Sequence, residues 1–268
     1  MENGKYSQLK KIIAELGSSG GIIVAYSGGT DSTLVLKIAH DVLGDHAIAM
    51  TAVSASLAAT DRIEAQEIAS LIGARHILVD TDETSNPEYL ANTSNRCFLC
   101  KTDTYDKLAA YAQAHGFHTI VDGTNADDAH DYRPGRKAAH QHNVRSPLLE
   151  AGLTKAEIRE LSRELGLPNW DKPAAACLSS RIPYGTTITL QALSQVERAE
   201  ALVHSLGLRQ LRVRHHDSIA RIEVEPDDFP LLLKYRQQIV NGLKSLGYTY
   251  VTLDLGGFRS GSMNESIL

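Results

Sequence analysis

Short apolar runs alternate with amphipathic stretches through the first two-thirds of the chain. The apolar runs predict strands at residues 22–26, 47–53, 76–79 and 119–121. Helical spacing between them predicts helices near residues 34–39, 61–72 and 97–115, and a further helix at 154–165. Thr154 with Glu157 three residues later is the pattern of a capping box at the start of that last helix. Strands that alternate with helices indicate an α/β domain with a parallel sheet.

The order of elements changes after Thr189. A helix at 190–206, strands at 210–215 and 219–224, a helix at 229–246 and a strand at 248–253 follow one another. This αββαβ succession predicts a smaller α+β domain. The tripeptide Pro183-Tyr184-Gly185 interrupts the periodicity before it. We therefore expect one domain at residues 1–185 and a second at residues 186–268.

Length and charge narrow the class of protein. A chain of 268 residues can bury the cores of two domains. Its net charge of −5 and pI near 6.1 argue against a general nucleic-acid binder. The sequence contains no apolar stretch of about 18 residues, and residues 1–5 lack the apolar segment of a signal peptide. We expect a soluble cytoplasmic protein that binds neither membrane nor nucleic acid.

The most informative motif lies between the first predicted strand and helix, at residues 27–32 with the sequence Ser-Gly-Gly-Thr-Asp-Ser. Two glycines permit a tight turn, and the free amides at a helix start favour a bound phosphate. The motif lacks the Gly-Lys-Ser/Thr of a Walker loop and the spacing of a dinucleotide fingerprint. The simpler alternative is a helix N-terminus capped by Ser or Asp. The motif resembles the PP-loop of ATP pyrophosphatases, which split ATP into AMP and pyrophosphate.

That resemblance assigns roles within the loop. It implies that Asp31 holds Mg²⁺ and that phosphate oxygens of ATP are bound by Ser27, Gly28, Gly29 and Ser32. A second segment with Gly123 follows the predicted strand at 119–121, at the edge where open α/β sheets bind ligands. We expect Gly123 to contact ATP as well. Asp128, with Asp127 beside it, is either a further magnesium ligand or a cap of the following segment.

Three cysteines form a second constellation. Cys97 and Cys100 lie three residues apart on a predicted helix, whereas Cys177 is distant in sequence. Three thiolates can hold a [4Fe-4S] cluster and leave its fourth iron open to a sulfide. A zinc site, a redox pair and small buried side chains are the alternatives.

Arginines form a third group. Arg212 and Arg214 alternate on a predicted strand, so both point to one face, where paired guanidinium groups suit a phosphate. A solvated strand face is the alternative. Arg259, in a glycine-rich segment, is a further phosphate-binding candidate.

The combined motifs resemble the LarE family over nearly the whole chain. They comprise residues 27–32, Asp131-Tyr132-Arg133-Pro134-Gly135, residues 179–185, 212–214 and 219–223, and residues 253–261. LarE proteins are ATP-dependent sulfur transferases in the biosynthesis of the nickel-pincer nucleotide of lactate racemase. Their substrate is pyridinium-3,5-biscarboxylic acid mononucleotide, whose carboxylates become thiocarboxylates. The resemblance also implies a homo-oligomer and a sulfide source that the sequence does not identify.

Two branches of that family differ in their sulfur donor. One consumes a single cysteine, and the other carries three cysteines and a [4Fe-4S] cluster that binds an extra sulfide. Cys97, Cys100 and Cys177 match the second branch, whereas the sacrificial position of the first falls at Ala176. A shift of one residue in that alignment would make Cys177 a sacrificial donor. Lys101 and Arg181, near these cysteines in sequence, are expected to steady developing negative charge.

Three other functions fit parts of the pattern. A tRNA thiolase of the PP-loop class also uses three cysteines, but it needs a basic surface. An amidotransferase or NAD-synthase-like ligase uses ammonia and needs no cysteine triad. A nucleotide-sensing or metal-binding module without catalysis would release no AMP.

Overall fold

The computed structural model describes residues 4–130, 135–173 and 176–259. The chain divides into two compact units. The first comprises residues 1–54, 59–83 and 97–175, and the second comprises residues 55–58, 84–96 and 176–268. Residues 176–185 thus group with the second unit, whereas the sequence pattern puts the boundary after residue 185. Two segments that contribute to the family resemblance, Asp131 to Pro134 and Ser260-Gly261, lie outside the described residues.

The first unit is built on a four-stranded sheet in the order β3-β2-β1-β4. Its strands are β1 (Ile22–Ala25), β2 (Ala47–Val53), β3 (Arg75–Asp80) and β4 (Thr119–Val121). All three pairings are parallel, and Ile22 lies in register with Ala47 on one side and Thr119 on the other. The predicted parallel α/β sheet is confirmed. Because β1 lies between β2 and β4, the residues after β1 emerge at the centre of one sheet edge.

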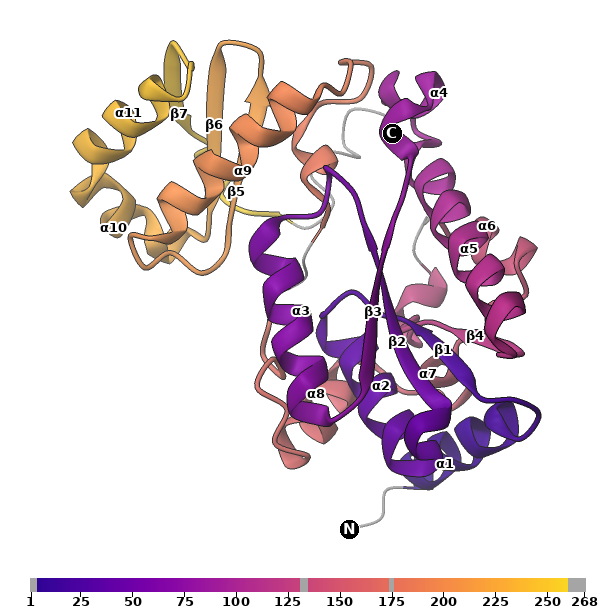
Figure 1. Ribbon diagram of the computed structural model, residues 1–268. Coiled ribbons are helices and arrows are strands. Elements are labelled where there is room, and N and C mark those ends of the chain that lie inside the picture. Colours follow the sequence, from indigo (N-terminus) through magenta and orange to yellow (C-terminus); the bar gives the residue numbers. More distant parts are fainter. Residues whose placement is uncertain (1–3, 131–134, 174–175, 260–268) are drawn as a thin grey trace. The chain divides into compact units, whose positions relative to one another are not determined.

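Helices cover this sheet on both faces (Figure 1). They are α1 (Gly4–Gly17), α2 (Thr30–Leu43), α3 (Ala59–Ile72), α5 (Arg96–His115), α6 (Gly135–Gln141), α7 (Pro147–Glu150) and α8 (Lys155–Glu164). The predicted capping box is confirmed, since the Thr154 side chain accepts from the Glu157 amide and the Glu157 side chain accepts from the Thr154 amide. The sequence pattern assigned no element to residues 4–17, where α1 buries Leu9 and Ile13.

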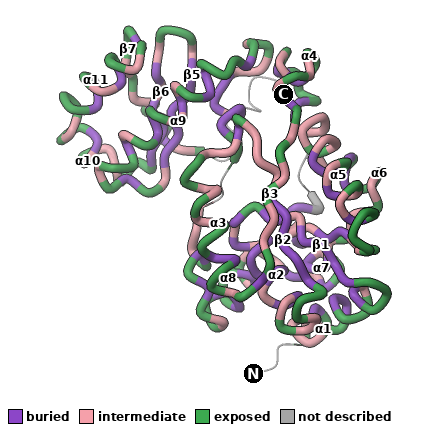
Figure 2. The backbone as a smooth tube through the Cα atoms, viewed as in Figure 1, coloured by how far each residue is buried: buried purple, intermediate pink, exposed green. Residues whose placement is uncertain are grey.

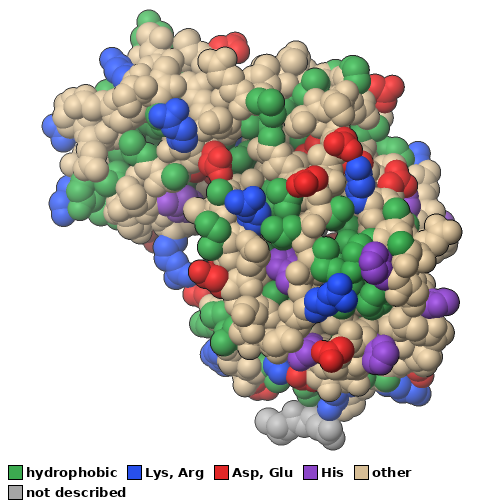
Figure 3. All heavy atoms as spheres, viewed as in Figure 1, with side chains coloured by type: hydrophobic (Ala, Val, Ile, Leu, Met, Phe, Trp, Pro, Cys, Tyr) green, Lys and Arg blue, Asp and Glu red, His purple; other side chains and the backbone are tan. Residues whose placement is uncertain are grey.

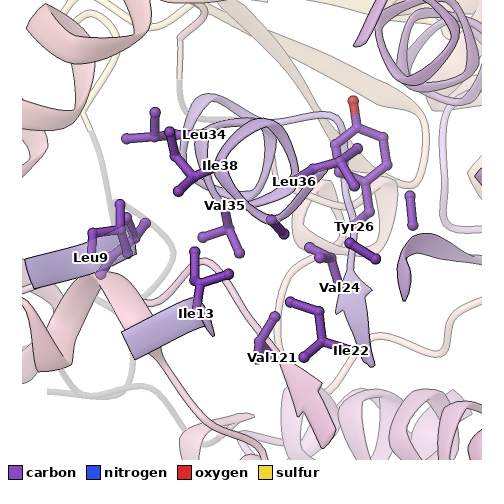
Figure 4. Close-up of a cluster of buried hydrophobic side chains, with 14 of the residues drawn as sticks. Leu9, Ile13, Ile22, Val24, Tyr26, Leu34, Val35, Leu36, Ile38 and Val121 are labelled. Carbon is purple, nitrogen blue, oxygen red and sulfur yellow. The ribbon is translucent and has the colours of Figure 1, made fainter. Parts of the chain in front are cut away.

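Each face of the sheet has its own apolar layer. On one face, side chains of α1, α2 and α8 pack with Ile22, Val24 and Val121 of the strands. Figure 4 shows Leu9 and Ile13 of α1 near Val35 of α2 in this layer. On the other face, Leu108 of α5 packs against strand side chains that include Ile23 and Ile48. Strands buried on both faces read as continuous apolar runs, which is why β1 and β2 were recognisable in the sequence.

The second unit has a three-stranded sheet in the order β5-β6-β7. Its elements are α4 (Pro87–Leu90), α9 (Leu190–His204), β5 (Leu211–His216), β6 (Ile219–Val224), α10 (Phe229–Lys234), α11 (Arg236–Ser245) and β7 (Tyr250–Leu253). Strands β5 and β6 are antiparallel, and β6 and β7 are parallel. The helix expected at 229–246 is two helices, because Tyr235 between them leaves helical geometry at φ −94° and ψ 11°. Figure 2 shows the buried stretches of β5 and β6.

The charged surface is mixed. On the face that Figure 3 draws, Lys and Arg side chains are interspersed with Asp and Glu side chains. None of the helices in the described part of the chain combines the length and apolar character needed to cross a bilayer.

Candidate functional site

The glycine loop joins the central strand β1 to the start of α2. Gly28 has a φ of +71°, and a Cβ there would lie 2.8 Å from the Ala65 Cβ of α3, so only glycine fits without strain. Gly29 is the N-cap residue of α2 in an extended conformation. Helix α2 therefore begins without a side-chain cap, so the alternative that this motif is a helix N-terminus capped by Ser or Asp is wrong. Free amides and the positive dipole end at a helix start can bind an anion.

Two hydroxyls face each other across this loop. The Oγ atoms of Ser27 and Ser32 lie 3.1 Å apart, and the Ser32 hydroxyl also donates to the Gly29 carbonyl at 3.2 Å. The Ser27 side chain is exposed, whereas Ser32 is buried. Both predicted phosphate-binding serines are thus brought together at the start of α2.

Gly123 lies against the same helix start. A Cβ on Gly123 would come within 2.7 Å of the Ser32 backbone nitrogen and 3.1 Å of the Asp31 carbonyl carbon. The chain after β4 therefore approaches the loop closely only because residue 123 has no side chain. Asp122 beside it accepts hydrogen bonds from the Ser146 hydroxyl at 2.8 Å and the Thr124 hydroxyl at 2.9 Å. These bonds fix the segment in which the sequence predicted a second nucleotide contact.

Asp31, the predicted magnesium ligand, is paired with a residue that the sequence analysis did not identify. The Lys155 ammonium group lies 2.8 and 2.7 Å from the two carboxylate oxygens of Asp31. Lys155 is the first residue of α8, and its backbone amide donates to Asp127 Oδ2 at 2.8 Å. Lys155 was hidden in the sequence because it lies 124 residues from Asp31 and belongs to no recognised motif.

Asp128 has a local structural partner. Its buried carboxylate accepts the Asn125 amide at 3.1 Å, and the Asn125 side chain accepts the Asp127 amide at 2.9 Å. These bonds hold the turn at residues 125–128, and in it Asn125, rather than either aspartate, accepts the amide at the start of the short helix. The Asp127 carboxylate instead receives the amide of Lys155 and is exposed.

Asn169 braces the glycine loop from outside the motif. Its buried side-chain amide donates to the Gly28 carbonyl and to Thr33 Oγ1, both at 2.9 Å. Its backbone carbonyl accepts the Thr30 hydroxyl at 2.9 Å. The sequence analysis missed this residue. No local pattern marks it, because its partners Gly28 and Thr33 lie 141 and 136 residues away in the sequence.

Cys97 and Cys100 lie in the first turn of α5 and are both partly buried. The Cys100 thiol donates to Glu83 Oε2 at 3.2 Å. Glu83 is buried after strand β3 and was also missed, because an isolated Glu gives no sign of a partner 17 residues away. The two cysteines have the donor type and spacing for two corners of an iron–sulfur cluster.

Lys101 follows this pair on α5. Its exposed side chain lies with Nζ 5.6 Å from the centre of the Tyr105 ring. Electrostatic interaction with Tyr105, and to a smaller extent with the Cys100 thiol, raises the pKa of Lys101 above its usual value. The lysine therefore stays cationic beside the two cysteines.

Cys177 is exposed and belongs to the second unit. The backbone around it is held by Arg181, whose Nη1 donates to the carbonyls of Ala176 and Cys177. The remaining donors of this buried guanidinium form a paired contact with Glu200, at 2.8 and 2.9 Å. Arg181 thus holds the backbone of the Cys177 turn, and its expected role toward developing negative charge stays a prediction.

Within the described residues, no group of three or more His, Cys, Asp or Glu side chains is arranged to hold a metal ion. Cys97 and Cys100 belong to one compact unit and Cys177 to the other. Three thiols are donors that both zinc and iron–sulfur clusters accept.

Arginines gather on one face of the second sheet. Arg212 and Arg214 are both buried, so the alternative of a solvated strand face is wrong. Arg214 donates to Glu223 Oε2 and to the Ser180 carbonyl, each at 2.8 Å. The Arg212 guanidinium lies 5.3 Å from the centre of the Phe258 ring. Phe258 directly precedes Arg259 in the chain. The Arg259 side chain donates to the Gly257 carbonyl in its own turn at 3.4 Å.

Glu223 is the centre of this group. Its fully buried carboxylate binds Arg214 through one oxygen and Arg221 through the other, at 2.8 and 3.0 Å. Arg221 also pairs with Asp254 at 3.1 Å. Neighbouring guanidinium groups of this kind suit an anion such as a phosphate.

Two relatives match this chain over nearly its full length. No protein-family model matches. An uncharacterized protein of Synechocystis sp. is 46% identical over 267 residues, which span 99% of this chain and 98% of that protein. The pyridinium-3,5-bisthiocarboxylic acid mononucleotide synthase of Lactiplantibacillus plantarum is 41% identical over 257 residues, 96% of this chain and 93% of that enzyme. A tRNA-specific 2-thiouridylase of Xanthobacter autotrophicus is 28% identical over 195 residues, 58% of this chain and 50% of that enzyme.

Proposed function

We propose that this chain uses ATP to convert carboxylates of pyridinium-3,5-biscarboxylic acid mononucleotide into thiocarboxylates. The chain belongs to the LarE family, the family of the Lactiplantibacillus plantarum synthase. The observation that carries the proposal is similarity to that synthase over nearly the full length of both chains. The geometry of the glycine loop supports the use of ATP, because it joins two hydroxyls and a helix start at the sheet edge.

The first step of the proposed reaction activates a carboxylate. A carboxylate oxygen attacks the α-phosphorus of ATP, and the bond to the bridging oxygen breaks, so pyrophosphate leaves with the electron pair. Ser27, Ser32 and the amides of Gly28 and Gly29 bind the phosphate oxygens. Asp31 would hold Mg²⁺, which when bound would neutralise charge on these oxygens.

The second step transfers sulfur. Sulfide attacks the acyl carbon, a C–S bond forms, the C–O bond to AMP breaks, and AMP leaves with the electron pair. We propose that Cys97, Cys100 and Cys177 hold a [4Fe-4S] cluster, which when bound supplies an open iron site for that sulfide. Lys101, a cation that follows Cys100 on α5, stabilises the negative charge that develops at the acyl oxygen. Arg181 keeps the Cys177 turn in one conformation through its bonds to two carbonyls.

The second domain provides the anchor for the substrate. We assign nucleotide activation to residues 1–185 and binding of the mononucleotide's phosphate to residues 186–268. Arg212, Arg214 and Arg259 bind that phosphate, and Glu223 holds the group together through Arg214 and Arg221. A homo-oligomer and a separate sulfide source complete the proposal.

Anaerobically prepared protein is incubated with Mg²⁺, ATP, the biscarboxylic mononucleotide and sulfide. Formation of AMP together with a product that has exchanged oxygen for sulfur is expected. Iron and acid-labile sulfide are measured in the wild type and in Cys97→Ala. About four irons per chain in the wild type, lost in the variant, would support the cluster. Sulfur transfer in protein that holds no iron would instead favour Cys177 as a consumed donor, and mass loss of one sulfur from the chain would identify it.

A further inference from the structure

Lys155 joins the two acidic positions beside the glycine loop. Its Nζ lies 2.8 and 2.7 Å from the two carboxylate oxygens of Asp31, while its backbone amide donates to Asp127 at 2.8 Å. Both side chains of the ion pair keep about a quarter of their surface exposed, 29% for Lys155 and 26% for Asp31. A ligand that arrives from solvent can therefore reach the pair.

A magnesium ion on Asp31 must compete with this lysine. Mg²⁺ binds carboxylate oxygen at about 2.0–2.1 Å in near-octahedral geometry. Both oxygens of Asp31 already accept the ammonium group. Two cations on the same oxygens repel each other, so the ammonium must give up at least one oxygen when the metal binds.

The backbone of Lys155 is fixed, and its side chain is the part that can move. Thr154 and Glu157 close a capping box around the start of α8, and Lys5 of α1 pairs with Glu157 at 2.7 Å. From this fixed point, a flexible four-carbon stem carries the ammonium group. A short rotation of that stem transfers the charge without any movement of the helix.

We propose that Lys155 exchanges partners during catalysis: it holds Asp31 in the nucleotide-free enzyme and moves to the pyrophosphate part of ATP when Mg²⁺ takes Asp31. This inference rests on the proposed function, in which pyrophosphate is the leaving group. As the bond between the α-phosphorus and the bridging oxygen breaks, the electron pair stays on pyrophosphate. The Lys155 ammonium group stabilises that charge, and the step moves no proton.

The test measures ATP binding by calorimetry as a function of Mg²⁺ concentration, which requires neither the carboxylate substrate nor sulfide. Lys155→Met is expected to reach half-maximal ATP binding at about two- to fivefold lower Mg²⁺, because its competitor on Asp31 is gone. At saturating Mg²⁺ the same variant is expected to bind ATP about tenfold more weakly, because a charge-assisted contact to phosphate is lost. A lower Mg²⁺ midpoint together with a weaker ATP affinity at saturating Mg²⁺ distinguishes an exchange of partners from a purely structural role of Lys155.

Two further variants serve as controls. Lys155→Arg keeps the charge and should stay within about twofold of the wild-type Mg²⁺ midpoint. Lys5→Met removes an ion pair to the same helix without touching Asp31, and should leave both quantities unchanged.

The proposal is overturned if Lys155→Met leaves both quantities at wild-type values, or if the Mg²⁺ requirement rises as ATP binding weakens. The second result would mean that Lys155 merely orients Asp31. Wild-type protein that binds no ATP would overturn this proposal and the proposed function together. Opposite shifts in protein that forms no thiocarboxylate would sustain the role of Lys155 and refute the proposed sulfur transfer.

Discussion

Removal of the Asn169 side chain is expected to weaken the glycine loop. The buried side-chain amide donates to the Gly28 carbonyl and to Thr33 Oγ1, both at 2.9 Å. Asn169→Ala removes both bonds and leaves the buried Gly28 carbonyl without this donor. Thr33 keeps its contact with the Tyr26 hydroxyl at 3.4 Å, so its loss is smaller.

The magnitude follows from these contacts. Two hydrogen bonds contribute about 1 kcal/mol each, and an unsatisfied buried acceptor costs about 1–3 kcal/mol. Asn169 Oδ1 is itself buried without a hydrogen-bond partner among the described residues, so its removal relieves part of that cost. We expect the free energy of unfolding to fall by about 2–3 kcal/mol. ATP binding should weaken by about tenfold, because the loop must be ordered without its brace.

The assays are denaturant unfolding and calorimetric titration with ATP, both on wild type and variant. Asn169→Asp is a stricter variant of similar size. Its carboxylate cannot donate to the Gly28 carbonyl, and its charge repels phosphate, so it should bind ATP more weakly than Asn169→Ala. Asn241→Ala, at an exposed position of α11, is the control and should change stability by less than about 0.5 kcal/mol. Asn169→Ala with wild-type stability and wild-type ATP affinity would refute the bracing role.

Three other outcomes test separate parts of the molecule. Gly28→Ala should bind ATP more weakly, because residue 28 has a φ of +71° and the new Cβ would meet Ala65. Gly44→Ala, at a position with positive φ but open space, should lower the free energy of unfolding by about 1–2 kcal/mol and bind ATP normally. Equal ATP affinities of the two variants in titration would contradict this. Glu200→Gln should lower the free energy of unfolding by about 3 kcal/mol in denaturant, because the buried guanidinium of Arg181 would lose its carboxylate partner. A loss below about 1 kcal/mol would show that the ion pair contributes little to stability. Hydrogen bonds from Lys5 and then from the Thr154 amide lower the pKa of Glu157 from 4.5 to about 2, so their stabilisation is complete above about pH 4.5 and is lost as the pH falls toward 2. Lys5→Met should return that pKa toward 4.5 in an NMR titration, and an unchanged pKa would exclude Lys5 as the cause.

The sequence was a good guide to elements whose signal is local. Strands β1 and β2 are buried on both faces, so their residues form unbroken apolar runs. The capping box at Thr154 and Glu157 depends on contacts within four residues and was predicted correctly. The glycine loop was recognisable because Gly28 and Gly29 stand between a strand and a helix.

Contacts between distant segments were beyond such reasoning. Asn169 meets Gly28 from 141 residues away, and Lys155 meets Asp31 from 124 residues away. Neither position has a residue type or spacing that indicates a partner. Glu83, which accepts the Cys100 thiol, was hidden for the same reason.

Local periodicity also failed in two helices. The break at Tyr235 divides a segment whose apolar spacing continues on both sides, so one long helix was expected. Residues 4–17 were given no element, although α1 buries Leu9, Ile12 and Ile13 in the apolar layer that it shares with α2 and the sheet.

The measurement that tests the central claim most directly is a single incubation of anaerobic protein with Mg²⁺, ATP, sulfide and the pyridinium biscarboxylic mononucleotide. AMP and the organic product are followed together by chromatography and mass spectrometry. The account predicts one AMP for each oxygen of a carboxylate replaced by sulfur, with no product when ATP is omitted. AMP release without sulfur in the product, or sulfur incorporation without ATP, would contradict it.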